Sequence, residues 1–184
     1  MLYVFGFEKI CVVLGDLYFV DPAPLKGQEG AEHGVRLELR VIVPGDQKES
    51  IYAATPIAVD QPIWRADFLE AVGGKPFDRT HHHPAFTGWA PSHRVFDRAL
   101  SADPLGWLEN KLGDLDGLLA EAKFPAETAG PRDAAQLRTA APEIVAATSR
   151  LLDRVRGGEL GNSPDPDAPI ELDGQWQLVR SGWL

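Results

Sequence analysis

The sequence has little cysteine and little basic charge. Cys11 is the single cysteine among 184 residues, which excludes an internal disulfide and a zinc module built on several cysteines. Only 18 Lys and Arg residues stand against 27 Asp and Glu residues, a formal net charge of −9. Duplex nucleic acid and anionic membranes are bound by clustered basic residues, so this balance argues against both as partners.

Long apolar runs are missing as well. The first twenty residues are rich in apolar side chains, but Glu8, Lys9 and Asp16 interrupt them. No uncharged run there is long enough to cross a membrane, and the cleavage site of a signal peptide is absent. We therefore expect a soluble cytoplasmic protein in which Cys11 is buried, reduced and a poor nucleophile. Arginine outnumbers lysine 12 to 6 and alanine is plentiful, which favours a GC-rich bacterial source.

What is present is the composition of a globular domain, with 44% apolar and 24% charged residues. The length is close to that of one domain, so we predict a single α+β domain over residues 1–184. Its antiparallel sheet, a meander or partial barrel, comes from the N-terminal third of the chain. Two or three helices follow, and a C-terminal hairpin completes the sheet.

Strands are predicted in the first 70 residues by alternation of side chains with period two. Residues 3–7 place three aromatic side chains on one face. Residues 10–20 contain Gly15-Asp16, which predicts a type II′ hairpin covered on both sides. Residues 35–43 alternate apolar and charged side chains, which predicts a half-buried strand with a solvated charged face.

Two further segments are predicted to form strands, although one contains a proline and the other also resembles a helix. Residues 51–59 alternate, but Pro56 lacks a backbone donor and therefore favours an edge strand or a bulge. Residues 63–69 fit a strand better than a helix. In that strand Arg65 and Asp67 lie on one face, where we expect a structural ion pair, with a ligand-orienting pair as the alternative.

Helical periodicity begins after residue 100. Asp103 and Pro104 predict a capped helix start, and leucines then recur at spacings of three and four through Leu119, which predicts one helix. A second helix is predicted over residues 133–156, kinked or divided by Pro142 and ended by Gly157-Gly158. A linker loop is expected at about residues 157–169.

The C-terminal hairpin is predicted from four apolar residues, Ile170, Leu172, Trp176 and Leu178. A three-residue loop pairs Leu172 with Trp176 and gathers all four on one face. A two-residue turn would scatter them over both faces.

Four of the five histidines lie within residues 81–93, inside a segment (about 73–101) that lacks clear periodicity. We expect a long ordered loop here, and such loops are often functional. In an extended segment His81 and His83 project to the same side, as two ligands of one metal ion do. His93 is the natural third ligand, with Asp97 or Asp78 as an oxygen ligand or supporting partner.

Other interpretations of this loop remain open. The histidines could pack with aromatic side chains over the sheet, form a pH-sensitive contact, or serve acid–base chemistry with Asp78 or Asp97. No nucleophile elbow, phosphate-binding loop or dinucleotide fingerprint occurs in the sequence.

The leading functional hypothesis is a non-catalytic binding or assembly module without a cofactor. It uses the loop at residues 78–94 to contact a protein or small molecule. This hypothesis is compatible with a homo-oligomer. The binding residues proposed for it are Asp78, Arg79, His82, Trp89 and Arg94. One alternative is a zinc-like hydrolase or metal-binding protein that holds a divalent metal through His81, His83, His93 and Asp97. Another is a carrier that encloses a small apolar ligand in its sheet.

Overall fold

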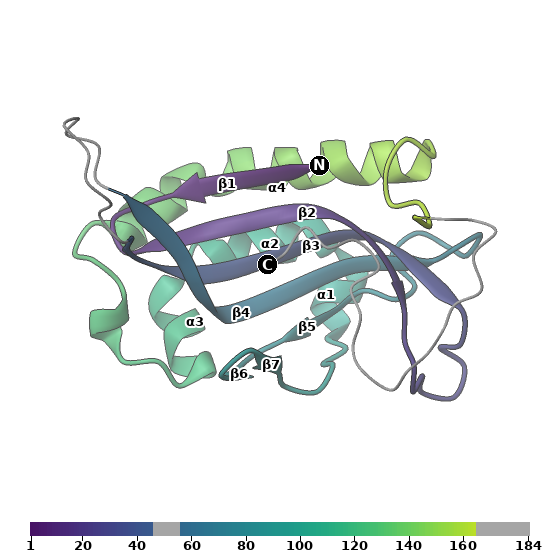
Figure 1. Ribbon diagram of the computed structural model, residues 1–184, viewed down its shortest axis with the longest axis horizontal. Helices are drawn as coiled ribbons and strands as arrows, with labels where there is room; N and C mark the ends of the chain where they lie inside the picture. Colours follow the sequence, from purple (N-terminus) through teal and green to yellow (C-terminus); the bar gives the residue numbers. More distant parts are fainter. Residues whose placement is uncertain (46–55, 165–184) are drawn as a thin grey trace.

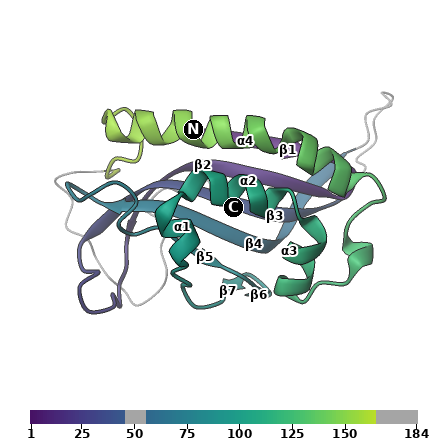
Figure 2. The ribbon, with the colours of Figure 1, turned by 180° about the vertical axis from the view of Figure 1, so that it is seen from behind.

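The computed structural model describes residues 1–45 and 56–164, and it confirms the α+β class. Five antiparallel strands form one sheet in chain order, the predicted meander (Figure 1). The helices cover one face of this sheet, as the view from behind shows (Figure 2). The strands are β1 (Leu2–Gly6), β2 (Ile10–Val20), β3 (Ala31–Pro44), β4 (Ile57–Ala71) and β5 (His81–His83).

The predicted hairpin at Gly15-Asp16 is wrong, because β2 continues straight through these residues. Gly15 is paired on both sides, with Leu2 of β1 and with Arg36 of β3. A turn there would leave the backbone groups of both neighbouring strands without partners. The chain reverses earlier instead, where the backbone N–H of Phe7 donates to the carbonyl of Ile10 (2.9 Å).

The strand interpretation of residues 63–69 is confirmed, and β4 extends it back to Ile57. β5 pairs only with Arg65, Ala66 and Asp67 of this strand, and among the described residues 57–59 pair with β3 alone, which agrees with the predicted edge position. The irregularity falls at Pro62 and not at Pro56: the register shifts on either side of Arg40, the residue that pairs with Pro62. Proline has no N–H for the ladder, which explains a bulge at that point.

The long leucine-rich helix is divided in two, contrary to the prediction. Gly113 ends the first part, and the Asp114 side chain accepts a hydrogen bond from the N–H of Gly117 (3.0 Å), which starts a new helix. The second predicted helix passes through Pro142 undivided and ends at Gly157. The helices are α1 (Arg98–Ala102), α2 (Pro104–Leu112), α3 (Leu115–Ala122), the 3-10 helix η1 (Ala126–Thr128) and α4 (Asp133–Arg156).

The hydrophobic core lies between the sheet and these helices. Both layers contribute fully buried side chains, so the predicted leucine stripe faces the sheet as expected. The largest contributors are Leu14, Leu37, Trp64 and Phe68 from the strands and Leu108, Leu112, Leu118 and Ile144 from the helices. The predicted C-terminal hairpin lies outside the described residues. Within the described part of the chain, no helix has the length and apolarity that crossing a membrane requires.

The opposite face of the sheet, called the polar face below, carries the charged residues of β3. The prediction that this face is solvated is wrong: Arg36, Glu38 and Arg40 are all buried. Their charges are paired across the sheet, and a small hairpin covers them. This hairpin, β6 (Phe86–Thr87) and β7 (Ala90–Pro91), sets aromatic rings over the guanidinium groups of Arg65 and Arg40.

Gly34 is required where β3 meets β4. Its φ angle is +151°, and a Cβ atom there would lie 2.1 Å from the backbone oxygen of Phe68. We therefore expect Gly34→Ala to lower the free energy of unfolding by about 3 kcal/mol or more, measured by urea denaturation. Gly6→Ala is the control, since its Cβ would meet only an ordinary contact at 3.8 Å. Equal stability of the two variants would contradict this role for Gly34.

Cys11 is buried as predicted, and burial raises the pKa of its thiol from 9.0 to about 11. The thiolate is the reactive form, so the folded protein should resist thiol reagents at pH 8. We expect a disulfide reagent to label Cys11 within seconds in denaturant and at least about 100-fold more slowly in buffer. The factor is the ratio of the thiolate fractions at a pKa of 9.0 and at a pKa of about 11. Labelling at the same rate in both conditions would contradict the burial.

Candidate functional site

The three consecutive histidines form strand β5, not part of a loop as predicted. His81 pairs with Asp67 of β4, and His83 pairs with Arg65. Successive residues of a strand face opposite sides of the sheet, so residues two apart face the same side. The expectation that His81 and His83 project to one side is therefore confirmed, and that side is the polar face. His82 faces the helices, where its ring lies 5.1 Å from that of Trp107.

Asp67, His81 and His83 form a buried cluster with their ligand atoms within 4.8 Å of one another. The Oδ2 atom of Asp67 lies 3.5 Å from Nε2 of His81 and 3.6 Å from Nε2 of His83. Arg36 holds the same carboxylate from the other side through two hydrogen bonds, 2.7 Å to Oδ1 and 3.0 Å to Oδ2. The Asp67 carboxylate therefore lies between the Arg36 guanidinium and the imidazole rings of His81 and His83.

Backbone carbonyls set the proton positions on both imidazoles. Nδ1 of His81 lies 2.7 Å from the carbonyl of Arg79, and Nδ1 of His83 lies 2.5 Å from that of Ser92. A carbonyl oxygen only accepts, so each Nδ1 must carry the hydrogen. In a neutral ring, Nε2 then has no hydrogen and presents its lone pair to Asp67.

Burial sets the charge state of this cluster. It lowers the pKa of His81 from 6.5 to about 4 despite the neighbouring Asp67 carboxylate, so His81 is neutral at pH 7. Burial alone would raise the pKa of Asp67, but the Arg36 guanidinium holds it well below 3.8. A bare nitrogen lone pair of His81 therefore faces an ionised carboxylate oxygen, an arrangement that a cation stabilises.

A cavity of about 600 Å³ opens over this cluster. Asp67, His81 and His83 belong to its wall together with three arginines, so the cluster is within reach of a small molecule. The other described residues that line it combine polar and apolar side chains: Arg36, Arg65, Arg94, Asp21, Ser92, His93, Phe19, Leu25, Leu69, Trp89, Ala90 and Pro91.

The two remaining metal-ligand candidates lie apart from the cluster. His93 lines the cavity but contributes no atom to the group formed by Asp67, His81 and His83. Asp97 starts helix α1, where its side chain accepts a hydrogen bond from the N–H of Ala99 (2.7 Å).

The binding candidates are divided between structural and cavity positions. Asp78 accepts a hydrogen bond from the N–H of Ala71 (2.8 Å) and closes the turn after β4. Arg79 and Arg94 both approach the buried Glu32, and Arg94 bonds it at 3.1 Å. Trp89 is 61% exposed at the cavity rim.

Asp67 is the cluster residue that sequence reasoning did not assign to the site. Alternation with Arg65 placed both on one strand face, which is correct, but they do not pair with each other. Arg65 bonds Glu38 (2.7 Å from Nε to Oε1), and Asp67 bonds Arg36. Directly opposed cross-strand neighbours are closer than residues two apart on one strand, so partners on β3 are preferred. The register of β3 and β4 shows which residues are these partners, and the spacing along the chain does not.

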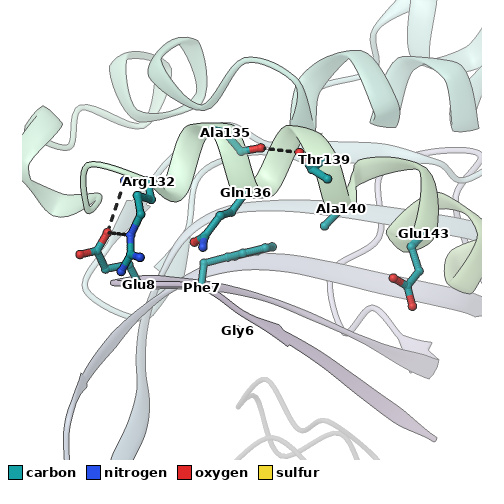
Figure 3. Close-up of a pocket in the computed structure, with 9 residues that line it drawn as sticks. All are labelled: Gly6, Phe7, Glu8, Arg132, Ala135, Gln136, Thr139, Ala140 and Glu143. Atoms are coloured by element: carbon teal, nitrogen blue, oxygen red, sulfur yellow. Dashed lines mark hydrogen bonds and ion pairs between the residues drawn. The ribbon is translucent and has the colours of Figure 1, made fainter.

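A second groove lies between β1 and α4 (Figure 3). Its volume is about 660 Å³, and an ion pair of Glu8 with Arg132 (3.6 Å) closes one end. The Thr139 hydroxyl donates to the carbonyl of Ala135 within the helix. The described residues that line this groove include neither histidine nor cysteine, so it offers much less chemistry than the cavity on the polar face.

Comparisons with protein-family models, with curated proteins and with solved structures find no match to this chain. The assignment of the site therefore depends on the geometry described above.

Removing one partner from the pair of Arg36 and Asp67 should be strongly destabilising, since both side chains are buried. Arg36→Met leaves an unpaired buried carboxylate, and we expect a loss of about 3–5 kcal/mol in the free energy of unfolding. The double variant Arg36→Met/Asp67→Leu should recover most of this loss. Arg154→Met is the control: it breaks an exposed pair with Glu159 and should cost less than about 1 kcal/mol. A double variant as unstable as the single one would contradict the coupling.

Proposed function

We propose that this protein is a metal-dependent enzyme of the hydrolase class that binds one divalent transition-metal ion through Asp67, His81 and His83. One observation carries the proposal. Two imidazole Nε2 atoms with fixed tautomers converge on one carboxylate oxygen in the wall of a cavity of ligand size.

The donor set fits such an ion. Two imidazoles and one carboxylate suit zinc, iron(II) and nickel, and three protein ligands leave positions open, as in catalytic sites. Metal-ligating histidines usually donate their other N–H to a carbonyl or carboxylate, which fixes the ring. His81 and His83 do this with the carbonyls of Arg79 and Ser92. Binding also requires neutral imidazoles, and His81 is neutral at pH 7.

The surrounding residues supply the rest of the chemistry. A bound ion of this kind provides a Lewis acid and acidifies water. Arg65 lies directly opposite His83 in the register, where its positive charge favours an oxyanion on the substrate. Asp67, His81 and His83 are at most 6% exposed, so charges at the cluster interact with little screening by solvent.

A second candidate is the non-catalytic binding module. It is favoured by the partners that the charged groups already have: Arg36 bonds Asp67 and Arg65 bonds Glu38 without any metal. In this case the cavity and the exposed Trp89 at its rim would bind a small molecule or a protein segment, and the histidines would be hydrogen-bonded wall residues.

Metal binding separates the two candidates. Protein purified without a histidine tag or metal resin should contain about one equivalent of zinc, iron, manganese or nickel by elemental analysis. After removal of metal with EDTA, titration with zinc should show one tight site. His81→Ala/His83→Ala should weaken it by more than about 100-fold, because loss of a supporting residue alone costs 10- to 100-fold.

His93→Ala is the matched control, since His93 lines the cavity outside the cluster. It should retain zinc affinity within about threefold of the unmodified protein, a difference below 1 kcal/mol. If the folded protein binds no metal, or if the double variant binds zinc as tightly as the unmodified protein, the metal-dependent function is refuted and the binding module remains.

A further inference from the structure

A second, small cavity of about 60 Å³ lies on the polar face beside the cluster. Arg36, Arg65 and Trp89 line both this cavity and the large one, so the two adjoin. The described residues around the small cavity, called the arginine pocket below, are Arg36, Glu38, Arg40, Pro62, Arg65 and Trp89.

The arginine pocket has a surplus of positive charge among the described residues. Three guanidinium groups share two carboxylates: Asp67 pairs with Arg36, while Glu38 bonds both Arg40 (3.1 Å) and Arg65. The side chains of these arginines are only 8–13% exposed. Arginine cannot give up its proton in a protein, so the surplus charge cannot be removed by titration.

This local charge runs against the composition of the whole chain, whose net charge is −9. An incompletely paired buried charge is costly, and buried charges are normally paired, so a surplus guanidinium group at a cavity marks a candidate site for an anion. From this we infer that the arginine pocket binds the oxyanion, a carboxylate or phosphate, of a small organic molecule.

The shape of the pocket agrees with such a group. A water molecule needs a cavity volume of about 10–15 Å³. The 60 Å³ of this pocket therefore accommodates an oxyanion but not the body of an organic molecule. Guanidinium groups match carboxylate and phosphate through paired N–H donors. The ring of Trp89 lies 4.9 Å from the guanidinium carbon of Arg40 and closes one side.

The rest of the ligand has room in the large cavity. Phe19, Leu25 and Leu69 line that cavity and suit an apolar body. Arg65 is opposite His83, so an anion held by Arg65 keeps the adjoining part of the molecule near the histidine cluster. The identification of this molecule as the substrate rests on the proposed metal-dependent function, whereas the binding of the anion does not.

Binding is tested on EDTA-treated full-length protein with three probes of similar shape: benzoate, phenyl phosphate and neutral benzamide. We expect at least one of the two anions to raise Tm with its concentration and to give saturable binding by calorimetry. The relative affinities of benzoate and phenyl phosphate identify the preferred oxyanion. Benzamide should give neither response.

Arg40→Met removes the surplus charge and leaves Glu38 paired with Arg65. We expect the affinity for the anion to fall about 10- to 100-fold, the effect of losing one charge-assisted hydrogen bond. The variant also loses the hydrogen bond from Nε of Arg40 to the carbonyl of Asp60 (2.8 Å), so the Tm without ligand should fall by only a few degrees. Arg40→Lys keeps the charge and should restore part of the affinity. Arg79→Met is the control, because Arg79 pairs with Glu32 and lines neither cavity.

Failure of both anions to bind the folded protein, equal binding of benzamide, or unchanged affinity in Arg40→Met would overturn the arginine pocket as an anion site. The test of the proposed metal site is independent of the test of the arginine pocket. Without metal, His81→Ala/His83→Ala should still bind the anion. Zinc binding without anion binding therefore refutes only the pocket, and anion binding without zinc binding refutes only the metal-dependent function.

Discussion

The buried ion pair between Arg36 and Asp67 organises the polar face of the sheet. It joins β3 to β4 near the middle of their pairing, and it keeps Asp67 ionised where burial alone would protonate it. This carboxylate and the two histidines of β5 form the proposed metal site, because the Nε2 atoms of both rings lie 3.5–3.6 Å from its Oδ2 atom. Arg65 and a hydrogen bond with His83 also lower the pKa of Asp67, but Arg36 has the largest of these effects.

The two faces of the sheet carry different kinds of side chain. The helix-covered face provides the apolar core, with Trp64 and Phe68 fully buried against leucines of the helices. The polar face buries charges under the small β6–β7 hairpin, and burial of charge is unfavourable unless partners are in place. Stability therefore comes from the core, while the polar face holds the charged groups on which the proposed functions depend. Gly34 lets β3 and β4 approach closely within this charged surface.

Much of the fold could be predicted from alternation and capping. The aromatic face of β1, the strand over residues 63–69, the helix start at Asp103 and the helix end at Gly157 are all local patterns, and the structure has them. One error shows where local patterns fail. Gly15-Asp16 has the composition of a turn, but pairing with β1 and β3 on both sides keeps it extended. Local propensity is a weak preference that pairing in the tertiary structure overrides.

The sequence by itself singled out the histidine segment and placed His81 and His83 on one side, because alternation along a strand is a local property. Only the tertiary structure decided their partners. Asp67 is fourteen residues from His81 and Arg36 is thirty-one residues from Asp67, and nothing in their spacing states that they meet. The register of β3, β4 and β5 brings them together, and a shift of one residue would send every one of these side chains to the other face.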